Sequence, residues 1–310
     1  MLQVLVLGSA AGGGFPQWNC NCSLCARARA GDPAVMARTQ SSLAISSGDG
    51  KWFLLNASPD LRKQIDDNSL LHPDPRSTRN SPIAGAVLTN ADVDHIAGLL
   101  NLRESQPLSI YATARVHDVL ARNPVYGVLN PKYVARREIK VEQRTDLAGF
   151  DGVINGLAIE AFPVPGKVAL YLEDSSKADL GSRPEDTIAL KVTERTTGRS
   201  FFYIPGCAAL PIELAKRLRG ADLVFFDGTV WEDDEMIAAK AGAKTGARMG
   251  HMHMAGDDGS VAAFAKLGVA RKIFVHINNT NPVLAEDSPE RALVEGAGWE
   301  VGYDGMRVTL

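Results

Sequence analysis

The stretch that decides the fold is residues 83–98, which read IAGAVLTNADVDHIAG. Ile83 to Leu88 is an almost wholly apolar run, the pattern of a strand that is covered on both faces. The carboxylates of Asp92 and Asp94 and the imidazole of His95 follow it at once. Proteins with α/β folds place ligands at such strand ends, and side chains of this kind are costly to bury without partners. The stretch therefore predicts a polar site at the end of a core strand.

A second apolar run ends in the same way. Residues 272–275 are followed by His276 and then by the polar run 278–281, which reads NNTN. Two histidines and one carboxylate form the facial triad that is typical of non-haem iron(II) oxygenases. We therefore predict that Asp94, His95 and His276 are catalytic and hold one iron(II) ion. The alternative for His276 is a core histidine that bonds to the backbone.

Two more aspartates are candidates for the same site. Asp92 is either an additional ligand of the active-site metal or a solvated helix cap. Asp227 ends the apolar run Leu223–Phe226 and is expected either to bind the metal or to orient one of its ligands.

Other apolar runs and turn signals predict the remaining elements. Strands are expected at Leu2–Leu7, Ser42–Ser46, Lys51–Leu55, Leu108–Tyr111, Ile154–Phe162, Val168–Leu172, Thr187–Val192 and Ser200–Ile204, and helices at Pro59–Ile65, Ile96–Glu104 and Gly256–Leu267. The strands come in groups with helices between them, which favours an α/β fold of two packed sheets with helices outside, an αββα sandwich. We expect a single domain over 1–310, with the less apolar region 113–152 as a candidate insertion.

The composition limits the classes of partner. Hydrophobic residues make up 45% of the 310 residues, which is ample for a core. The formal net charge of −3 argues against a nucleic-acid groove built on bulk positive charge. No run reaches the roughly 18 apolar residues that a membrane span needs, and the start lacks the basic region of a signal peptide. We therefore expect a cytoplasmic protein that binds neither nucleic acid nor a membrane.

Three of the four cysteines, Cys20, Cys22 and Cys25, are clustered. Thiolates at this spacing can wrap one metal ion, and a fourth ligand completes a tetrahedron. Such clustering in a reducing compartment favours a structural zinc over a disulfide, and a group of buried or reactive thiols is the alternative. For the fourth ligand we favour His251, with His253 as the second choice and Cys207 as a further candidate.

Residues 90–98 resemble a degraded form of the His-x-His-x-Asp-His motif of the metallo-β-lactamase superfamily. Asn90 and Asp92 stand at the first two histidine positions, and the last two positions match. The resemblance implies a metallo-β-lactamase-like αββα sandwich with its metal site at this turn.

Other parts of the superfamily's metal site are missing. No histidine stands at 162–167, where that of the third motif is expected, and Pro205-Gly206-Cys207 replaces the bridging aspartate. The surviving set is that of one metal only: Asp94, His95 and His276. The usual two-metal hydrolase is therefore not assembled.

The chain also resembles, over essentially its whole length, the PQQ synthesis protein B family of this superfamily. Long and unusual strings carry the resemblance: LGSAAGGGFPQWNC at 7–20, RTQSS at 38–42, NASPD at 56–60, DGTVWEDD at 227–234 and HINNTNP at 276–282. It implies a role in pyrroloquinoline quinone (PQQ) biosynthesis, as an iron(II)- and O₂-dependent hydroxylase of the tyrosine ring of a glutamate–tyrosine-derived precursor. Other PQQ biosynthesis proteins are candidate partners. A non-catalytic carrier in the transport of PQQ or its precursor, or a phosphodiesterase-type hydrolase, is the alternative.

A precursor of this kind carries several carboxylates, so cationic and amide donors are expected near the pocket. The candidate substrate-binding residues are Trp18, Arg38, Arg103 and Asn279. Pairing of Arg103 with a neighbouring glutamate is an equally good interpretation.

Overall fold

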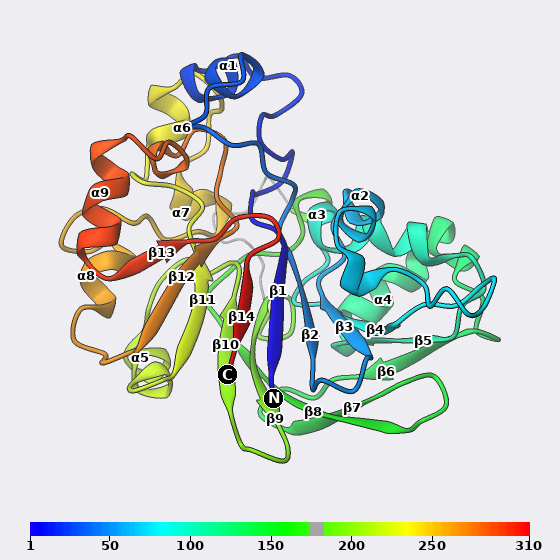
Figure 1. Ribbon diagram of the computed structural model, residues 1–310. Coiled ribbons are helices and arrows are strands. Elements are labelled where there is room, and N and C mark those ends of the chain that lie inside the picture. The colour runs from blue at the N-terminus through cyan, green and yellow to red at the C-terminus, as the bar shows by residue number, and fades with distance from the viewer. Residues whose placement is uncertain (174–182) are drawn as a thin grey trace.

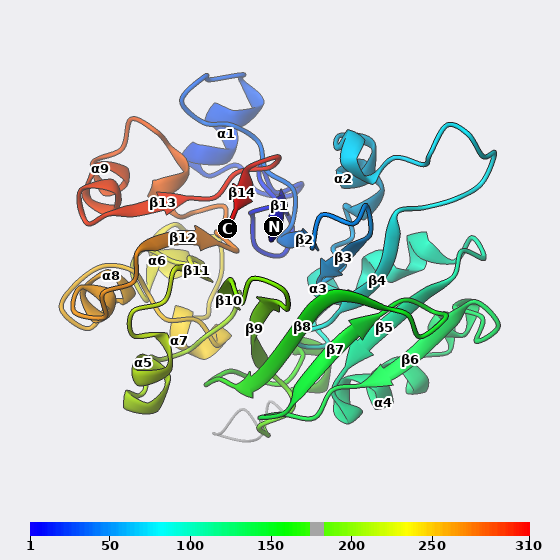
Figure 2. The same cartoon turned by 60° about the horizontal axis from the view of Figure 1, so that its bottom comes forward.

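Two sheets packed face to face form the centre of the structure, a computed structural model that describes residues 1–173 and 183–310. Within these residues each sheet has seven strands. Figures 1 and 2 show helices on the outer side of each sheet and the two termini side by side on neighbouring strands of the first sheet. This is an αββα sandwich, so the expected fold class is confirmed.

The first sheet carries the turn that contains Asp94. Its strands are, in spatial order, β14 (Arg307–Thr309), β1 (Gln3–Gly8), β2 (Ser42–Ser46), β3 (Trp52–Leu55), β4 (Ile83–Val87), β5 (Leu108–Ala112) and β6 (Val134–Glu138). Pairing is antiparallel from β14 to β3 and parallel from β3 to β6. The carboxyl ends of β3, β4 and β5 therefore lie along one edge.

The second sheet carries His276. Its strands are, in spatial order, β13 (Trp299–Val301), β12 (Arg271–Val275), β11 (Leu223–Asp227), β10 (Ser200–Ile204), β9 (Ile188–Glu194), β8 (Ile154–Pro163) and β7 (Arg144–Ala148). Strands β10 to β13 are parallel, with Asp227 of β11 opposite Val275 of β12. Asp227 and His276 therefore leave the sheet at neighbouring strand ends.

Helices flank both sheets. On the first sheet they are α2 (Leu61–Asp66), α3 (Val93–Ile96) and α4 (Ala114–Arg122), with 3₁₀ turns η1 (Ser69–Leu71), η2 (Ala97–Leu102) and η3 (Pro124–Val128). The second sheet is flanked by α1 (Ser23–Arg29), α5 (Ile212–Leu218), α8 (Ser260–Phe264) and α9 (Pro289–Gly296). The connection from β11 to β12 also holds α6 (Glu235–Ala238) and α7 (Gly246–Met249), and two further 3₁₀ turns are η4 (Leu170–Leu172) and η5 (Pro282–Leu284).

Alternating side chains of the central strands fill different layers of the core. Phe225 and Ile273 belong to the cluster between the sheets, whereas Phe226 and Phe274 belong to the cluster under the helices. Phe274 stacks on Trp299 of β13 with ring centroids 3.8 Å apart. Burial on both faces explains why these strands are unbroken apolar runs.

The prediction of a strand at Val168–Leu172 is wrong. The segment forms the 3₁₀ turn η4 instead, and the side chains of Leu170, Tyr171 and Leu172 are exposed. Its polar groups bond to the turn before α3 rather than to a sheet, because the Leu170 amide donates to Asp92 and the Tyr171 hydroxyl to the Ala91 carbonyl. The apolar run therefore lies along the Asp92 loop.

The region 113–152 forms α4, η3, β6 and β7. Strands β6 and β7 lie at the outer edges of the first and second sheets, so the region extends both sheets; its description as an insertion stays a prediction. The expected helix at Ile96–Glu104 is replaced by the short α3 and the 3₁₀ turn η2. Among the described residues, no helix combines the length and apolar character that a membrane crossing requires.

Gly98 fixes the approach of η2 to the loop after β3. An added Cβ would clash with the carbonyl oxygens of Ser58 and Ala57. Gly98→Ala should therefore lower the free energy of unfolding by about 1–3 kcal/mol, the usual cost of overpacking, as measured by urea unfolding. Gly296→Ala is the matched control, since nothing lies within 4 Å of the added methyl there. Equal losses in the two variants would contradict this account.

Candidate metal centre

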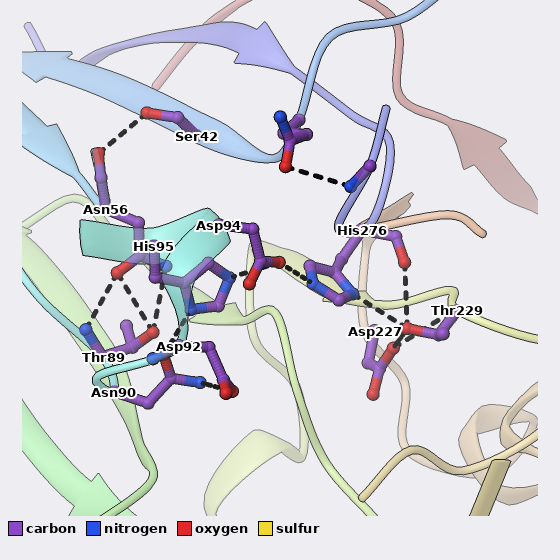
Figure 3. A network of polar contacts seen from close by, with 12 residues as sticks. Ser42, Asn56, Thr89, Asn90, Asp92, Asp94, His95, Asp227, Thr229 and His276 are labelled. Atoms are coloured by element: carbon purple, nitrogen blue, oxygen red, sulfur yellow. Dashed lines mark hydrogen bonds and ion pairs between the residues drawn. The ribbon is translucent and has the colours of Figure 1, made fainter. Parts of the chain in front are cut away.

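Three side chains meet where the loops of the two sheets face each other. Asp94 and His95 lie in α3, directly after β4, and His276 follows β12. Their ligand atoms all lie within 4.8 Å of one another. Asp94 Oδ2 is 3.1 Å from His276 Nε2 and 3.9 Å from His95 Nε2. Figure 3 shows the Asp94 carboxylate between the two imidazoles. The structure thus brings the three predicted catalytic residues together.

The backbone at His276 aims its ring at this point. Its φ angle of +58° lies in the left-handed region, which residues other than glycine rarely adopt. The chain leaves β12 at this residue, and the Ile277 amide then donates to the Ser9 carbonyl of the loop after β1. Such strain persists only when the surrounding structure imposes it, and it clusters at functional sites.

Asn90 fixes the tautomer of His95. Their contact, 2.7 Å between His95 Nδ1 and Asn90 Oδ1, can form only if Nδ1 carries the proton, because the amide oxygen is an acceptor. His95 Nε2 is then left with its lone pair, and it is buried without a hydrogen-bond partner. A buried imidazole nitrogen that faces a carboxylate and another imidazole suits a metal ion.

Thr229 and Asp227 orient His276 from the opposite side. Thr229 Oγ1 lies 2.9 Å from His276 Nδ1 and 2.6 Å from Asp227 Oδ1. The hydroxyl can accept from the imidazole and donate to the carboxylate, which directs His276 Nε2 toward Asp94 (Figure 3). Asp227 therefore acts on the centre through Thr229, as one of the two roles expected for it.

The charge states of Asp94, His95 and His276 depend on one another. Burial opposes ionisation of Asp94, but the imidazoles of His95 and His276 hold its pKa well below the usual range. Burial lowers the pKa of His95 and so keeps it neutral. Burial also opposes the charge on His276, yet its pKa is raised because it donates to Asp94. A metal ion would replace that shared proton, since metal ligands must be deprotonated. The donor set therefore fits one divalent cation.

His251 lies in this region and not beside the cysteines. Its Nδ1 is 2.7 Å from Asp227 Oδ2, and its ring stacks on that of His276 at 5.1 Å between centroids. The ligand atoms of Asp227, His251 and His276 also lie within 4.8 Å of one another. The preferred assignment of His251 to the zinc site is therefore corrected: the buried carboxylate of Asp227 holds its imidazole at the end of β11.

The other two candidates for the fourth zinc ligand also have different partners. His253 Nε2 is 3.2 Å from Asp258 Oδ1. Cys207 is buried, its thiol donates to the Ala209 carbonyl, and its amide donates to Asp227.

The three clustered cysteines do form one group. The Sγ atoms of Cys20, Cys22 and Cys25 lie within 4.8 Å of one another at the start of α1. Burial raises the pKa of the Cys22 thiol to about 11, so a cation is needed to hold it as a thiolate at neutral pH. The donor set fits a thiolate-binding metal such as zinc.

None of the candidate substrate-binding residues is found in the group of Asp94, His95 and His276. Trp18 is 85% exposed, and Arg103 pairs with the neighbouring Glu104 as the alternative interpretation expected. Arg38 is buried, and its guanidinium donates to the Gly302 carbonyl and to Ser9 Oγ, which is a structural role. Asn279 directs its amide at the cysteine sulfurs.

Asp92 is not a member of the ligand group either. Its Oδ2 accepts from the Asn90 amide and its Oδ1 from the Leu170 amide, with Lys167 Nζ at 3.8 Å. It stands at the N-cap position of α3, but its side chain makes no capping hydrogen bond to that helix. Its carboxylate holds the surrounding loops together.

Sequence reasoning missed the functions of Asn90 and Thr229. Asn90 was interpreted only as a lost ligand, whereas it orients His95. Thr229 could have been found from the parallel pairing of two apolar runs, because β11 and β12 end side by side and Thr229 lies two residues beyond β11.

Fold and site together define a class of protein, and comparison with known families agrees. The model of the "Beta-lactamase superfamily domain" matches residues 51–277, so this is a domain of that superfamily. Coenzyme PQQ synthesis protein B of Rhodopseudomonas palustris strain BisB5 is 51% identical over 310 residues, all of both chains. That of Gluconacetobacter diazotrophicus is 51% identical over 309 residues, with 100% of both chains covered.

A solved structure gives the same result. The crystal structure of Zn²⁺-bound PqqB from Methylobacterium extorquens is similar with a TM-score of 0.93 and 49% identity, over 99% of this chain and 100% of that one. The chain belongs to the coenzyme PQQ synthesis protein B family.

The hydrogen bond between His95 and Asn90 leads to a testable prediction. Asn90→Ala should weaken metal binding at Asp94, His95 and His276 by about 10–100-fold, the usual effect of losing a partner that orients a ligand. The measurement is anaerobic competition for iron(II) against a calibrated chelator. Asn130→Ala removes an exposed asparagine that caps only its own turn, and it should leave the affinity unchanged. Wild-type affinity in Asn90→Ala would refute the assigned role.

Proposed function

We propose that this protein acts in PQQ biosynthesis as an iron(II)- and O₂-dependent hydroxylase of the tyrosine ring of a glutamate–tyrosine-derived precursor. The observation that carries the proposal is the convergence of Asp94, His95 and His276, with ligand atoms within 4.8 Å of one another. Two histidines and one carboxylate would hold one metal ion with coordination positions left for O₂ and a substrate oxygen. Membership of the coenzyme PQQ synthesis protein B family supports the pathway.

Iron(II) supplies the redox chemistry that O₂ activation needs and that zinc, with no accessible second oxidation state, lacks. One oxygen atom enters the ring, and the other leaves as water with two protons and two electrons from an external reductant. Asp94, His95 and His276 hold the metal, and Asn90 and Thr229 fix the two imidazoles. The ring and O₂ are thereby brought together at one centre.

His251 handles protons in this proposal. Its Nδ1 donates to the buried carboxylate of Asp227, which leaves the Nε2 lone pair to accept a proton. The stacking on His276 places this imidazole beside the metal ligands. A histidine oriented by a carboxylate is a common acid–base pair, and it would take the proton of the phenol oxygen and return it later.

Zinc is proposed for the second group, Cys20, Cys22 and Cys25. A tetrahedral site with every position filled has no place for a substrate, so its function is structural. The similar PqqB from Methylobacterium extorquens is Zn²⁺-bound, which supports zinc as a metal for this family.

A two-metal hydrolase is disfavoured because the residues at the lost ligand positions have other hydrogen-bond partners. Asn90 bonds to His95 and to Asp92, and the amide of Cys207 donates to Asp227. Within residues 1–173 and 183–310, each ligand group at the strand ends contains His276, and the Nδ1 atom of this shared imidazole already bonds to Thr229.

The central prediction concerns His276. His276→Ala should abolish the transfer of labelled oxygen from O₂ to the tyrosine ring of a glutamate–tyrosine precursor, because the iron loses a ligand. Mass spectrometry of the product measures this, and zinc content and the unfolding midpoint should stay near wild type. His72→Ala, a change at an exposed histidine, is the control. If wild-type iron-loaded protein binds such precursors yet never transfers labelled oxygen, the carrier function replaces the hydroxylase.

His251 gives a second prediction. His251→Ala should lower the hydroxylation kcat by about 10²–10⁴-fold, the usual contribution of a positioned acid–base group, with iron content unchanged. The KM for the precursor should stay near wild type, which a loss of the fold would not allow. If His251→Ala instead loses iron as His276→Ala does, then the group of Asp227, His251 and His276 holds the metal.

A further inference from the structure

Three cationic side chains surround one buried carboxylate near the candidate metal centre. The side chain of Glu173 is only 9% exposed. Its carboxylate oxygens lie 3.1 Å from Lys167 Nζ, 3.0 Å from Lys244 Nζ and 3.7 Å from Arg248 Nη2. Burial opposes ionisation of Glu173, but the ammonium groups of Lys244 and Lys167 lower its pKa. Lys167, Lys244 and Arg248, here called the cation group, can therefore hold a carboxylate out of water.

One side of the cation group touches the loop before α3. Lys167 Nζ is 3.8 Å from Asp92 Oδ1. Asp92 accepts from the Asn90 amide, and Asn90 in turn accepts from His95. The backbone of the lysine is fixed as well, because the Lys167 carbonyl accepts from Thr187 Oγ1. A short chain of polar contacts thus joins Lys167 to a residue of the metal centre.

The other side of the cation group adjoins His251, whose ring stacks on that of His276. Arg248 belongs to α7 and precedes His251 by three residues. A Cβ added to Gly250 would lie 3.2 Å from Lys167 Cγ, so the stem of the lysine packs against the residue just before His251. The cation group therefore lies beside the centre at which the phenol ring is proposed to react.

The cation group carries more positive charge than its carboxylates neutralise. Among the described residues, Glu173 and Asp92 are the carboxylates that pair with it, so three positive charges face two negative ones. Arg248 Nη1 is buried and makes no hydrogen bond within the described part of the chain. A buried guanidinium nitrogen without an acceptor is costly, so the group is suited to a further anion.

We propose that Lys167, Lys244 and Arg248 bind a carboxylate of the substrate, and that Glu173 competes with the substrate for this place. The inference rests on the proposed hydroxylation of a glutamate–tyrosine-derived precursor and names the residues that recognise its carboxylates. Exchange of one carboxylate for another leaves the number of charged pairs constant. A phenol oxygen at the metal and a carboxylate at the cation group give the precursor two points of attachment, which orient the ring.

Binding to the iron(II)-loaded full-length protein without O₂ tests the proposal, because it requires no turnover. The probe is a glutamate–tyrosine dipeptide, compared with the same dipeptide whose carboxylates are converted to amides. Arg248→Ala and Lys244→Ala should each weaken binding of the charged dipeptide by about 10–100-fold, the effect of losing one hydrogen bond to a charged group. Binding of the neutral dipeptide should stay at the wild-type level. Isothermal titration calorimetry measures both affinities.

Two matched controls separate this effect from one of net charge. Arg122→Ala and Lys216→Ala each remove an exposed cation that pairs with an acid of its own helix. Both should bind the charged dipeptide like wild type, and a loss equal to that in Arg248→Ala would overturn the proposal. Equal losses for the charged and the neutral dipeptide would also overturn it, because the cation group would then only support the fold.

Glu173→Gln should have the opposite effect. The change removes the competing charge at nearly constant size, so the charged dipeptide should bind at least about threefold more tightly, as when a competing state of a site is removed. In turnover the KM should fall while kcat stays unchanged. Binding as weak as in Lys244→Ala would contradict the competition, because Glu173 would then be needed to place the cations.

Failure of the hydroxylase function has a different signature. Wild-type protein that binds the dipeptides with this pattern, yet transfers no labelled oxygen, would disprove the hydroxylation and leave the carboxylate site standing. Equal affinity of wild type for the charged and the neutral dipeptide would disprove the carboxylate site, whatever the result of the oxygen-transfer assay.

Discussion

The contact between the carboxylate of Asp94 and the imidazole of His276 is the constraint on which the rest of the site depends. It joins positions 182 residues apart, one from each sheet, at a distance of 3.1 Å. Buried ionisable groups are tolerated only when they are paired or bind a metal. The left-handed backbone at His276 and the hydrogen bonds that Asn90 and Thr229 accept from the two imidazoles hold this one contact in place.

The position of this site could be predicted from the sequence, because the ends of buried strands can be recognised there. The apolar runs before Asp94 and His276 are buried on both faces, so each run marks a core strand and each polar residue after it marks an end. The same logic identified Asp227 as either a metal ligand or a group that orients one, and it bonds to Thr229 beside His276. It failed at Val168–Leu172, where the apolar run forms the 3₁₀ turn η4 and lies against the loop of Asp92.

Side chains that reach a site from a remote part of the sequence could not be predicted in the same way. Spacing shows that three cysteines can share an ion, but it carries no information on which remote residue faces them. His251 was the chemically reasonable choice, yet the buried Asp227 holds it elsewhere. Asn279 was interpreted as a contact for substrate carboxylates because amides are common there, and its position becomes evident only when β12 and α1 are placed in space.

The single-metal centre proposed for Asp94, His95 and His276 changes the roles of the residues at the first two positions of the motif. In a two-metal site each ion helps to hold shared ligands, whereas here three protein ligands must be aimed by hydrogen bonds alone. Asn90 stands at the first histidine position of the motif, and its amide oxygen now accepts from His95 instead of leaving a gap. Its amide nitrogen donates to Asp92, at the second position, which in turn accepts from the Leu170 amide. The lost ligands have thus become the support of the remaining ones, so restoring histidine at position 90 alone would remove the acceptor of His95 before it could create a second metal site.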